Sequence, residues 1–133
     1  MAAIKRFGFG VQALIILASN TGQCSSEEIA SHINCEPTAL RKILVRLTET
    51  GLIKVKQGRG GGYTLAKQPK DIALVEVYHA VLDESPQWLR MLDTTGDHLF
   101  GTKMRESFGK IMNDIHGQID LVLQSYTIAD LIE

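Results

Sequence analysis

The chain has 133 residues, of which 44% are hydrophobic and 22% charged, and 14 lysines and arginines stand against 15 aspartates and glutamates for a formal net charge of −1. This length suffices for one small domain with its own core, and the composition excludes collagen, low-complexity disorder and a disulfide scaffold. The near-neutral total argues against a nucleic-acid partner, because proteins that bind phosphates usually carry a basic surplus.

The first predicted element is an amphipathic helix over residues 7–19. Its apolar residues recur at the i, i+3, i+4 and i+7 spacing of one helix face, and Gly22 is expected to end it in the left-handed conformation. Lys5 and Arg6 before an apolar stretch are also typical of a secretory signal peptide. Two glycines and a glutamine interrupt the stretch, so we favour the helix.

A helix-turn-helix pair follows. Ser25 and Glu28 have the spacing of a capping box, which predicts the start of a second helix. Pro37 suits the first position of a third helix, which Gly51 would end. This third helix has an apolar face and a polar face with three cations. The apolar face comprises Leu40, Ile43, Leu44 and Leu47, and the polar face includes Thr38, Arg41, Lys42 and Arg46.

A β-hairpin is predicted next. Residues 52–56 and 63–65 are β-prone, and the stretch between them is rich in glycine. Arg59 stands at the tip, among the glycines at positions 58, 60, 61 and 62. The hairpin would therefore present one arginine on a flexible loop.

The second half is predicted to be helical. A fourth helix follows Pro69, and residues 83–101 are expected to form a linker or sensing loop with a short helical stretch near residues 87–92. Residues 102–133 would form a long helix and a C-terminal turn. Its apolar face either packs on its own domain or pairs with a second chain, and we favour a homodimer. That face comprises Met104, Phe108, Ile111, Ile115, Ile119, Val122 and Tyr126.

The net charge conceals an asymmetry. Residues 1–67 hold nine basic and four acidic residues, a balance of +5, whereas residues 68–133 hold five basic and eleven acidic ones, a balance of −6. Only the first region is suited to a polyanion.

These elements, in this order, predict a mainly α fold with a small β-hairpin wing, that is, a winged helix-turn-helix domain over residues 1–82 followed by a long dimerisation helix. The third helix fits a DNA major groove, where Thr38 and Arg41 would meet base edges or phosphates. Lys42 and Arg46 would contact backbone phosphates. Arg59 suits a narrow minor groove, where negative potential is concentrated.

Residues 51–66 read Gly-Leu-Ile-Lys-Val-Lys-Gln-Gly-Arg-Gly-Gly-Gly-Tyr-Thr-Leu-Ala. This string resembles the signature of the Rrf family of bacterial transcription regulators, of the IscR, NsrR and CymR type. Residues 5–8 and 71–77 also occupy the expected order, so the resemblance covers residues 1–82 closely and the last helix in outline.

The resemblance implies a homodimer that binds an inverted-repeat operator in double-stranded DNA, usually as a repressor, in response to a small-molecule or redox signal. It also implies which residues touch DNA. These are Lys5, Arg6, Arg41, Lys42, Arg46 and Arg59.

Metal-sensing members of this family hold an iron–sulfur cluster with three cysteines between the fourth helix and the dimerisation helix. Residues 83–104 of this chain contain no cysteine, and carboxylates and imidazoles do not replace three thiolates in such a cluster. We therefore predict a member without a cluster or other cofactor. His79 and Asp83, like His116 and Asp120, are four residues apart, but two ligands do not make a metal site, and none is predicted.

Cys24 and Cys35 flank the second helix. We favour small buried hydrophobes over the alternative, a redox switch beside the DNA-reading helix. If Cys35 lies at the start of the third helix, its thiolate would be favoured there.

No enzyme is predicted. The glycine-rich stretch lacks the Gly-Lys-Ser/Thr ending of a phosphate loop and does not open a helix, and no nucleophile motif is present. The remaining alternative is a winged-helix adaptor that binds a protein instead of DNA.

No apolar run approaches the roughly 20 residues needed to span a membrane, and two cysteines fit a reducing compartment, so the expected location is the cytoplasm.

Overall fold

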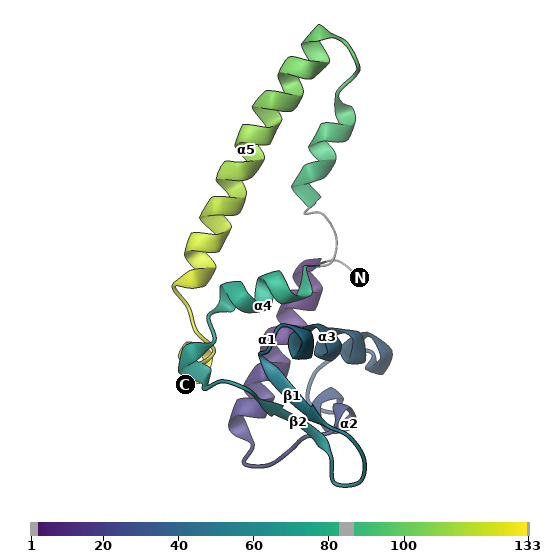
Figure 1. Cartoon of the computed structure of the whole chain (residues 1–133), viewed down its shortest axis with the longest axis vertical. Helices are drawn as coiled ribbons and strands as arrows, with labels where there is room; N and C mark the ends of the chain where they lie inside the picture. The colour runs from purple at the N-terminus through teal and green to yellow at the C-terminus, as the bar shows by residue number, and fades with distance from the viewer. Residues whose placement is uncertain (1–2, 83–86, 133) are drawn as a thin grey trace.

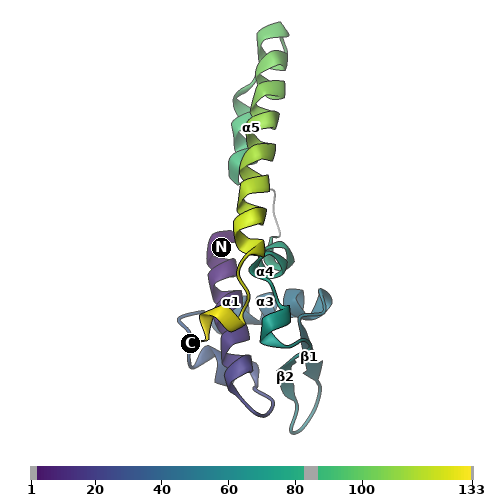
Figure 2. The same cartoon turned by 90° about the vertical axis from the view of Figure 1, so that its left-hand side faces the viewer.

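The computed structural model describes residues 3–82 and 87–132 and has two parts (Figures 1 and 2). Four helices and a hairpin pack together at one end, and a long helix runs away from them. The first part comprises α1 (Ala3–Ser19), α2 (Ser26–Ala30), α3 (Pro37–Glu49), β1 (Ile53–Lys56), β2 (Gly62–Leu65), the 3-10 helix η1 (Pro69–Asp71) and α4 (Leu74–Val81). The rest comprises the 3-10 helix η2 (Gln87–Thr94), α5 (Leu99–Gln124) and the 3-10 helix η3 (Ala129–Leu131).

The start of α2 and the end of α3 follow from local sequence. The Ser25 hydroxyl accepts from the backbone N–H of Glu28 at 3.1 Å, and the Glu28 carboxylate accepts from the N–H of Ser25 at 3.2 Å. Gly51 has a φ of 79°, and its N–H donates to the Thr48 carbonyl at 3.0 Å. The N–H of Leu52 donates to the Leu47 carbonyl, also at 3.0 Å. This Schellman arrangement needs a left-handed residue, so both predicted signals are confirmed.

The ends of α1 differ from the prediction. The helix begins at Ala3, four residues before the expected start. Gly22 is not in the left-handed region, so that expectation is wrong. The helix ends instead where the Asn20 side chain donates to the Ile16 carbonyl at 2.7 Å and competes with the next helical hydrogen bond.

The hairpin is the predicted wing. β1 and β2 pair antiparallel, with Ile53 opposite Leu65 and Lys56 opposite Gly62. The loop after α1 extends this sheet, because Cys24 exchanges two backbone hydrogen bonds with Tyr63, at 3.1 and 2.7 Å. The tip requires glycine at position 61, where a Cβ atom would collide with the Lys56 carbonyl. The wing is therefore tied to the helical core at its base and tightly turned at its tip.

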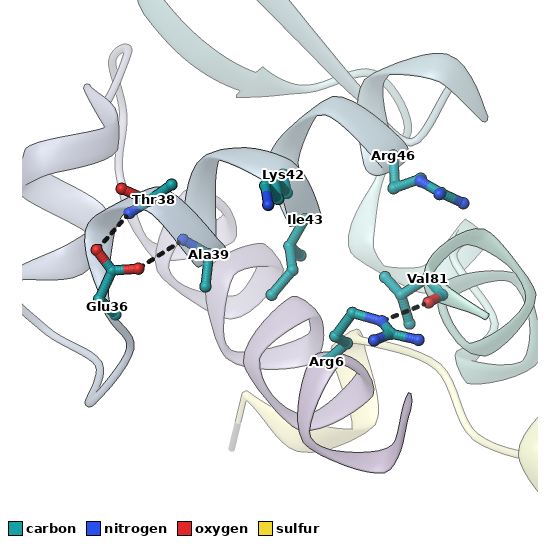
Figure 3. A pocket seen from close by; sticks show the side chains of 8 residues that line it. All are labelled: Arg6, Glu36, Thr38, Ala39, Lys42, Ile43, Arg46 and Val81. Carbon is teal, nitrogen blue, oxygen red and sulfur yellow. Dashed lines mark hydrogen bonds between the residues drawn. The ribbon is translucent and has the colours of Figure 1, made fainter. Parts of the chain in front are cut away.

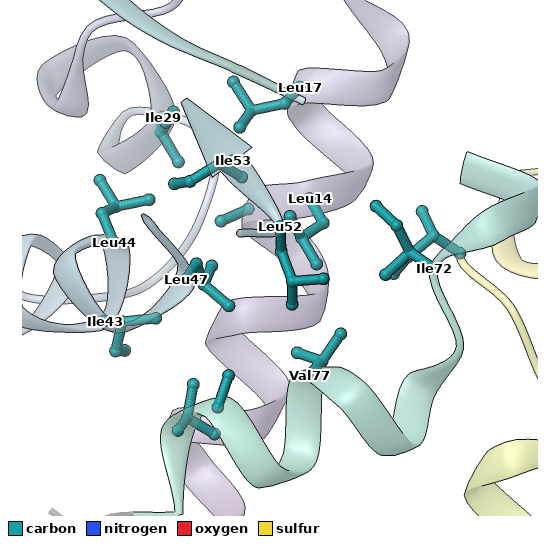
Figure 4. Close-up of a cluster of buried hydrophobic side chains, with 14 of the residues drawn as sticks. Leu14, Leu17, Ile29, Ile43, Leu44, Leu47, Leu52, Ile53, Ile72 and Val77 are labelled. Atoms are coloured by element: carbon teal, nitrogen blue, oxygen red, sulfur yellow. The ribbon is translucent and has the colours of Figure 1, made fainter. Parts of the chain in front are cut away.

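One hydrophobic core joins the helices to the hairpin (Figure 4). The four residues predicted to form the apolar face of α3 are all buried within it. Side chains from α1, the α2–α3 region, β1 and α4 complete it. Its largest fully buried members include Leu14, Ile29, Leu40, Ile43, Leu44, Leu47, Leu52, Ile53, Ile72, Val77 and Val81.

The predicted linker is shorter than expected. η2 occupies residues 87–94, and α5 begins at Leu99, where the His98 Nδ1 accepts from the Gly101 N–H at 3.1 Å. The guanidinium of Arg105 on α5 donates to the Leu92 carbonyl at 3.1 Å and to the Thr95 hydroxyl at 2.9 Å. η2 and α5 therefore form a hairpin, and residues 83–86 of the predicted linker lie outside the described residues.

The segment after α5 returns to the winged part. The N–H of Ile128 donates to the Ile72 carbonyl at 3.0 Å, and the N–H of Leu74 donates to the Tyr126 carbonyl at 2.9 Å. The Ile128 side chain is 0% exposed within the core. The C-terminal turn therefore packs in the same core as the winged part.

Replacing Ile128 with alanine should lower the free energy of unfolding by about 2–5 kcal/mol, because it leaves a cavity in the core. Urea unfolding followed by circular dichroism would measure this loss. The control is Ile132→Ala, at an exposed position in the same segment, where a loss of no more than about 0.5 kcal/mol is expected. Equal effects of the two substitutions would contradict the docking of this segment.

Candidate nucleic-acid interface

The polar face of α3 points out of the core because its opposite face is buried. Thr38, Arg41 and Lys42 are exposed and Arg46 is half-buried. The Thr38 hydroxyl lies 3.5 Å from a guanidinium nitrogen of Arg41, so the two predicted base-edge residues are neighbours. The structure thus presents the expected α3 residues on one side of the helix.

Glu36 caps the start of α3. Its two carboxylate oxygens accept from the N–H groups of Thr38 and Ala39, each at 3.1 Å. These hydrogen bonds to the charged form lower the pKa of Glu36 below its ordinary value. The carboxylate is therefore engaged by its own helix, although it lies beside the cationic side chains of that helix.

Arg6 from α1 joins the α3 cations, whereas Lys5 does not. The Arg6 Nε donates to the carbonyl of Val81, the last residue of α4, at 3.0 Å (Figure 3). Arg6, Lys42 and Arg46 line one cavity of about 290 Å³. Lys5 is exposed and is not among the residues that line this cavity.

The wing adds cations to those named from the sequence. Arg59 is exposed at the tip. Lys54 and Lys56 are exposed on β1, and because they are two residues apart their side chains leave the same face of the strand. The sequence analysis did not select these two lysines, although their alternation with apolar residues is the signal that could have found them.

The apolar face of α5 is divided between internal contacts and solvent. Met104 and Phe108 line a cavity with the turn after η2, and Ile119 and Val122 line a groove with Ile4, Phe7 and Tyr78 of α1 and α4. Ile111, Val122 and Tyr126 remain exposed, and Ile115 is half-buried. The sequence analysis missed Met112, which is buried, and Leu121, which is 62% exposed. Part of this face therefore packs within the chain and part is exposed, and its pairing with a second chain stays a prediction.

Comparison with known proteins decides the family. The profile of the Rrf2 family, described as an iron-dependent transcriptional regulator, matches residues 4–133. The chain belongs to the Rrf2 family of transcriptional regulators.

Among relatives of this Rrf2 protein, slr0846 of Synechocystis, named as a candidate HTH-type transcriptional regulator, is 31% identical over 127 residues, which cover 92% of this chain and 82% of that one. YwgB of Bacillus subtilis, similarly named, is 37% identical over 73 residues, which cover 53% of this chain and only 47% of that one. The structure of T. potens IscR superimposes with a TM-score of 0.68 at 29% identity and covers 96% of this chain and 82% of that one.

The iron implied by the family description does not fit this Rrf2 chain. Both of its cysteines lie in the winged part, and residues 83–104 contain none. Among the described residues, no group of three or more His, Cys, Asp or Glu side chains could hold a metal ion. One member of each i, i+4 pair considered above contacts the other pair, because the His79 Nε2 lies 2.9 Å from the Asp120 Oδ1 and joins α4 to α5. Asp83 lies outside the described residues.

The two thiols are not activated. Cys24 is buried and Cys35 half-buried, and neither forms a disulfide. Burial raises the pKa of both thiols, and the carboxylates of Glu28 and Glu36 raise them further. Cys35 precedes α3 as expected, but the expectation that its thiolate is favoured there is wrong, because burial and then the neighbouring Glu36 carboxylate raise the pKa of the thiol.

Within the described part of the chain, no helix is both long and apolar enough to span a bilayer.

Replacing Glu36 with glutamine should destabilise the protein near pH 7, and the difference from the parent should shrink in acid. The folded-state pKa of Glu36 is lowered, so its contribution is present above the ordinary value of 4.5 and is lost as pH falls through the folded-state value. Urea unfolding at a series of pH values would show the convergence. Glu49→Gln at the other end of α3 is the control, and a difference for Glu36→Gln that persisted in acid would contradict a role for the charge.

Proposed function

We propose that this Rrf2 protein is a homodimeric repressor that binds an inverted-repeat operator through α3 and the wing. The observation that supports this most directly is the one-sided burial of α3, which leaves three cations and Thr38 on a surface beside the glycine-tipped wing. A helix of this kind fits the major groove, and the wing then lies along the flanking backbone or minor groove.

Each cation has a separate task in this proposal. Arg41, near the start of α3 and beside Thr38, would contact base edges or phosphates. Lys42 and Arg46 would hold backbone phosphates and fix the position of α3. Arg59 would enter the minor groove, where the flanking glycines allow close approach. Lys5 would reach the backbone from the exposed start of α1.

The dimer would form through α5. Ile111, Leu121 and Val122 expose large apolar side chains along a helix that extends away from the winged part (Figure 1). The groove lined by Ile119 and Val122 continues this surface toward α1. An isologous contact between two such helices would bury these side chains and relate two α3 helices by a two-fold axis, as an inverted repeat requires.

The signal would be a small molecule acting in the cytoplasm, with η2 and the start of α5 as the sensing region. A redox signal through Cys24 or Cys35 is less well supported, because both thiols have raised pKa values.

Genomic footprinting would identify the operator, and binding would then be measured over a salt series. Affinity for the operator should fall steeply as salt rises, since each neutralised phosphate releases a counterion. A protein-binding adaptor on the same fold would bind no DNA at any salt concentration, and that result would reject the proposed function.

Replacing Arg59 with alanine should weaken operator binding about tenfold, because one charged contact is lost, and should reduce the salt slope by about one. Thermal stability should be unchanged, since an exposed side chain at the wing tip makes few contacts within the fold. Fluorescence anisotropy and calorimetry would measure the two effects. Lys103→Ala on exposed α5 is the matched control and should bind like the parent; a stability loss without an affinity loss in Arg59→Ala would contradict the wing assignment.

Replacing Val122 with glutamate should convert the dimer to a folded monomer, because a carboxylate on an apolar interface loses its hydration. The side chain is 55% exposed in the single chain, so the monomer should stay folded. Analytical ultracentrifugation gives the mass and circular dichroism the helicity. Lys110→Glu, on a polar position of the same helix, should remain dimeric, and a dimeric Val122→Glu would place the interface elsewhere.

A further inference from the structure

An apolar groove lies where the C-terminal end of α5 meets α1 and α4. Its lining among the described residues includes Ile4 and Phe7 of α1, Tyr78 of α4 and Val122 of α5. Ile4 and Val122 are exposed, so the groove is open in the single chain. Monomeric proteins seldom leave large apolar surfaces uncovered, and this surface is therefore suited to contact with another molecule.

The most exposed large apolar side chains of α5 lie at its other end. The helix begins with Leu99 and Phe100, which are 73% and 68% exposed, at the tip that points away from the winged part (Figures 1 and 2). Phe100 precedes Val122 by 22 residues of one continuous helix, a length of about 33 Å. The tip and the groove of one chain therefore cannot meet, whereas the tip of one copy can meet the groove of another.

The exposed apolar side chains of α5 are symmetric about Ile111. Ile111 lies 11 residues after Phe100 and 11 residues before Val122. Because 11 residues are close to three helical turns, these three side chains lie on one side of the helix. Leu99 and Leu121 are also 22 residues apart, and their midpoint is one residue from Ile111.

This symmetry matches two antiparallel α5 helices that are related by a two-fold axis near Ile111. Such an axis would bring Phe100 of one chain to the partner's Val122, beside the groove. Leu99 would meet the partner's Leu121, and Ile111 would meet its own copy. The pairing would therefore cover each of the exposed apolar side chains between Leu99 and Val122.

The apolar surface is large enough to contribute most of a dimer interface. At on the order of 100 Å² for each large apolar side chain, the five residues present about 500 Å² per chain, against roughly 800 Å² that each partner buries in a specific complex. Ser107 and Gln118 follow Phe100 and Ile111 by seven residues, or two turns, and are exposed. They would add polar area to the same side of the helix.

The length of α5 favours the antiparallel over the parallel arrangement. Each winged part lies at the groove end of its α5 (Figure 1). Antiparallel pairing sets the two groove ends about 33 Å apart, which is close to the roughly 34–36 Å between half-sites one DNA turn apart. Parallel pairing would bring the two helices, and hence the groove ends, within about 8–10 Å of each other.

We propose that two copies of this chain pair through antiparallel α5 helices, with the Leu99–Phe100 tip of each chain covering the groove of the other. This inference specifies the proposed homodimer and rests on it. The start of α5, which belongs to the proposed sensing region, would then contact α1 and α4 of the partner. A signal received by one chain would therefore act on the winged part of the other.

Cysteine cross-linking of the full chain tests the direction of the pair. Phe100→Cys and Val122→Cys chains with tags of different length are co-expressed and oxidised, and a mixed disulfide dimer is expected on a gel. Each variant alone should form little disulfide dimer, because like positions would lie about 33 Å apart. Ile111→Cys, near the axis, is the positive control and should cross-link to its own copy. The parent reports any cross-link through Cys24 or Cys35.

Three results would overturn the antiparallel pairing. One is a disulfide of Phe100→Cys with its own copy in higher yield than the mixed dimer, as a parallel pair requires. The second is the absence of the mixed dimer when Ile111→Cys does cross-link. The third is a dimer by ultracentrifugation in which none of these positions cross-links, since the interface would then lie elsewhere.

Replacing Phe100 with glutamate tests the contact of the tip with the groove. It should raise the dissociation constant of the dimer at least about tenfold, because a carboxylate would be buried against apolar side chains. Phe100 is exposed in the single chain, so the helicity should be unchanged. Asn113→Glu adds the same charge at an exposed position on the opposite side of α5 from Ile111 and should dimerise like the parent. Equal dissociation constants for Phe100→Glu and the parent would overturn the contact.

Operator binding separates the failure of this inference from that of the proposed function. A parallel dimer that binds the operator would overturn the antiparallel pairing and leave the DNA-binding role intact. A monomer would overturn both the pairing and the proposed homodimer. An antiparallel dimer that binds no DNA would support the pairing and reject the role as a repressor.

Discussion

Burial of Leu40, Ile43, Leu44 and Leu47 fixes the rotation of α3 about its own axis. Each of these side chains contributes roughly 1.5–3 kcal/mol when removed from water, whereas an exposed ion pair contributes about 1 kcal/mol or less. The core therefore decides which way the helix faces, and the cations follow. Arg41 and Lys42 point to solvent because the residues on either side of them, Leu40 and Ile43, face the core.

The same core connects the winged part to the segment after α5. Ile128, which follows the long α5, is buried beside Ile72 and hydrogen bonded to it through the backbone. α4 lies between these parts, and its last residue accepts the hydrogen bond from Arg6. The pair of His79 and Asp120 also joins α4 to α5, but both side chains are about half exposed and the contact adds little stability.

Charge is divided unequally along the chain. The basic excess lies in residues 1–67, which include α3 and the wing, and the acidic excess lies in residues 68–133, which include α5. Because exposed charges are screened beyond about 10 Å at moderate salt, a bound polyanion would respond to the local excess and not to the total of −1.

The sequence by itself determined the features that depend on neighbours three or four residues apart. These include the capping box at Ser25, the end of α3 at Gly51, the two faces of α3 and the hairpin with Arg59 at its tip. Their signals are local, so the mainly α winged fold could be predicted, and the string of residues 51–66 was specific enough to indicate the family. The role of the α3 and wing cations remains a prediction, although the structure presents them as expected.

Only the tertiary structure decided the contacts between distant segments. Nothing near Arg6 in the chain indicates that it meets the end of α4 and the α3 cations, and nothing near Ile128 indicates that it completes the winged core. The spacing of His79 and Asp83 suggested a local pair, whereas packing brings His79 to Asp120, forty-one residues away. Such contacts depend on how whole helices pack against one another, and this depends on the summed burial of many side chains, which no short pattern in the sequence contains.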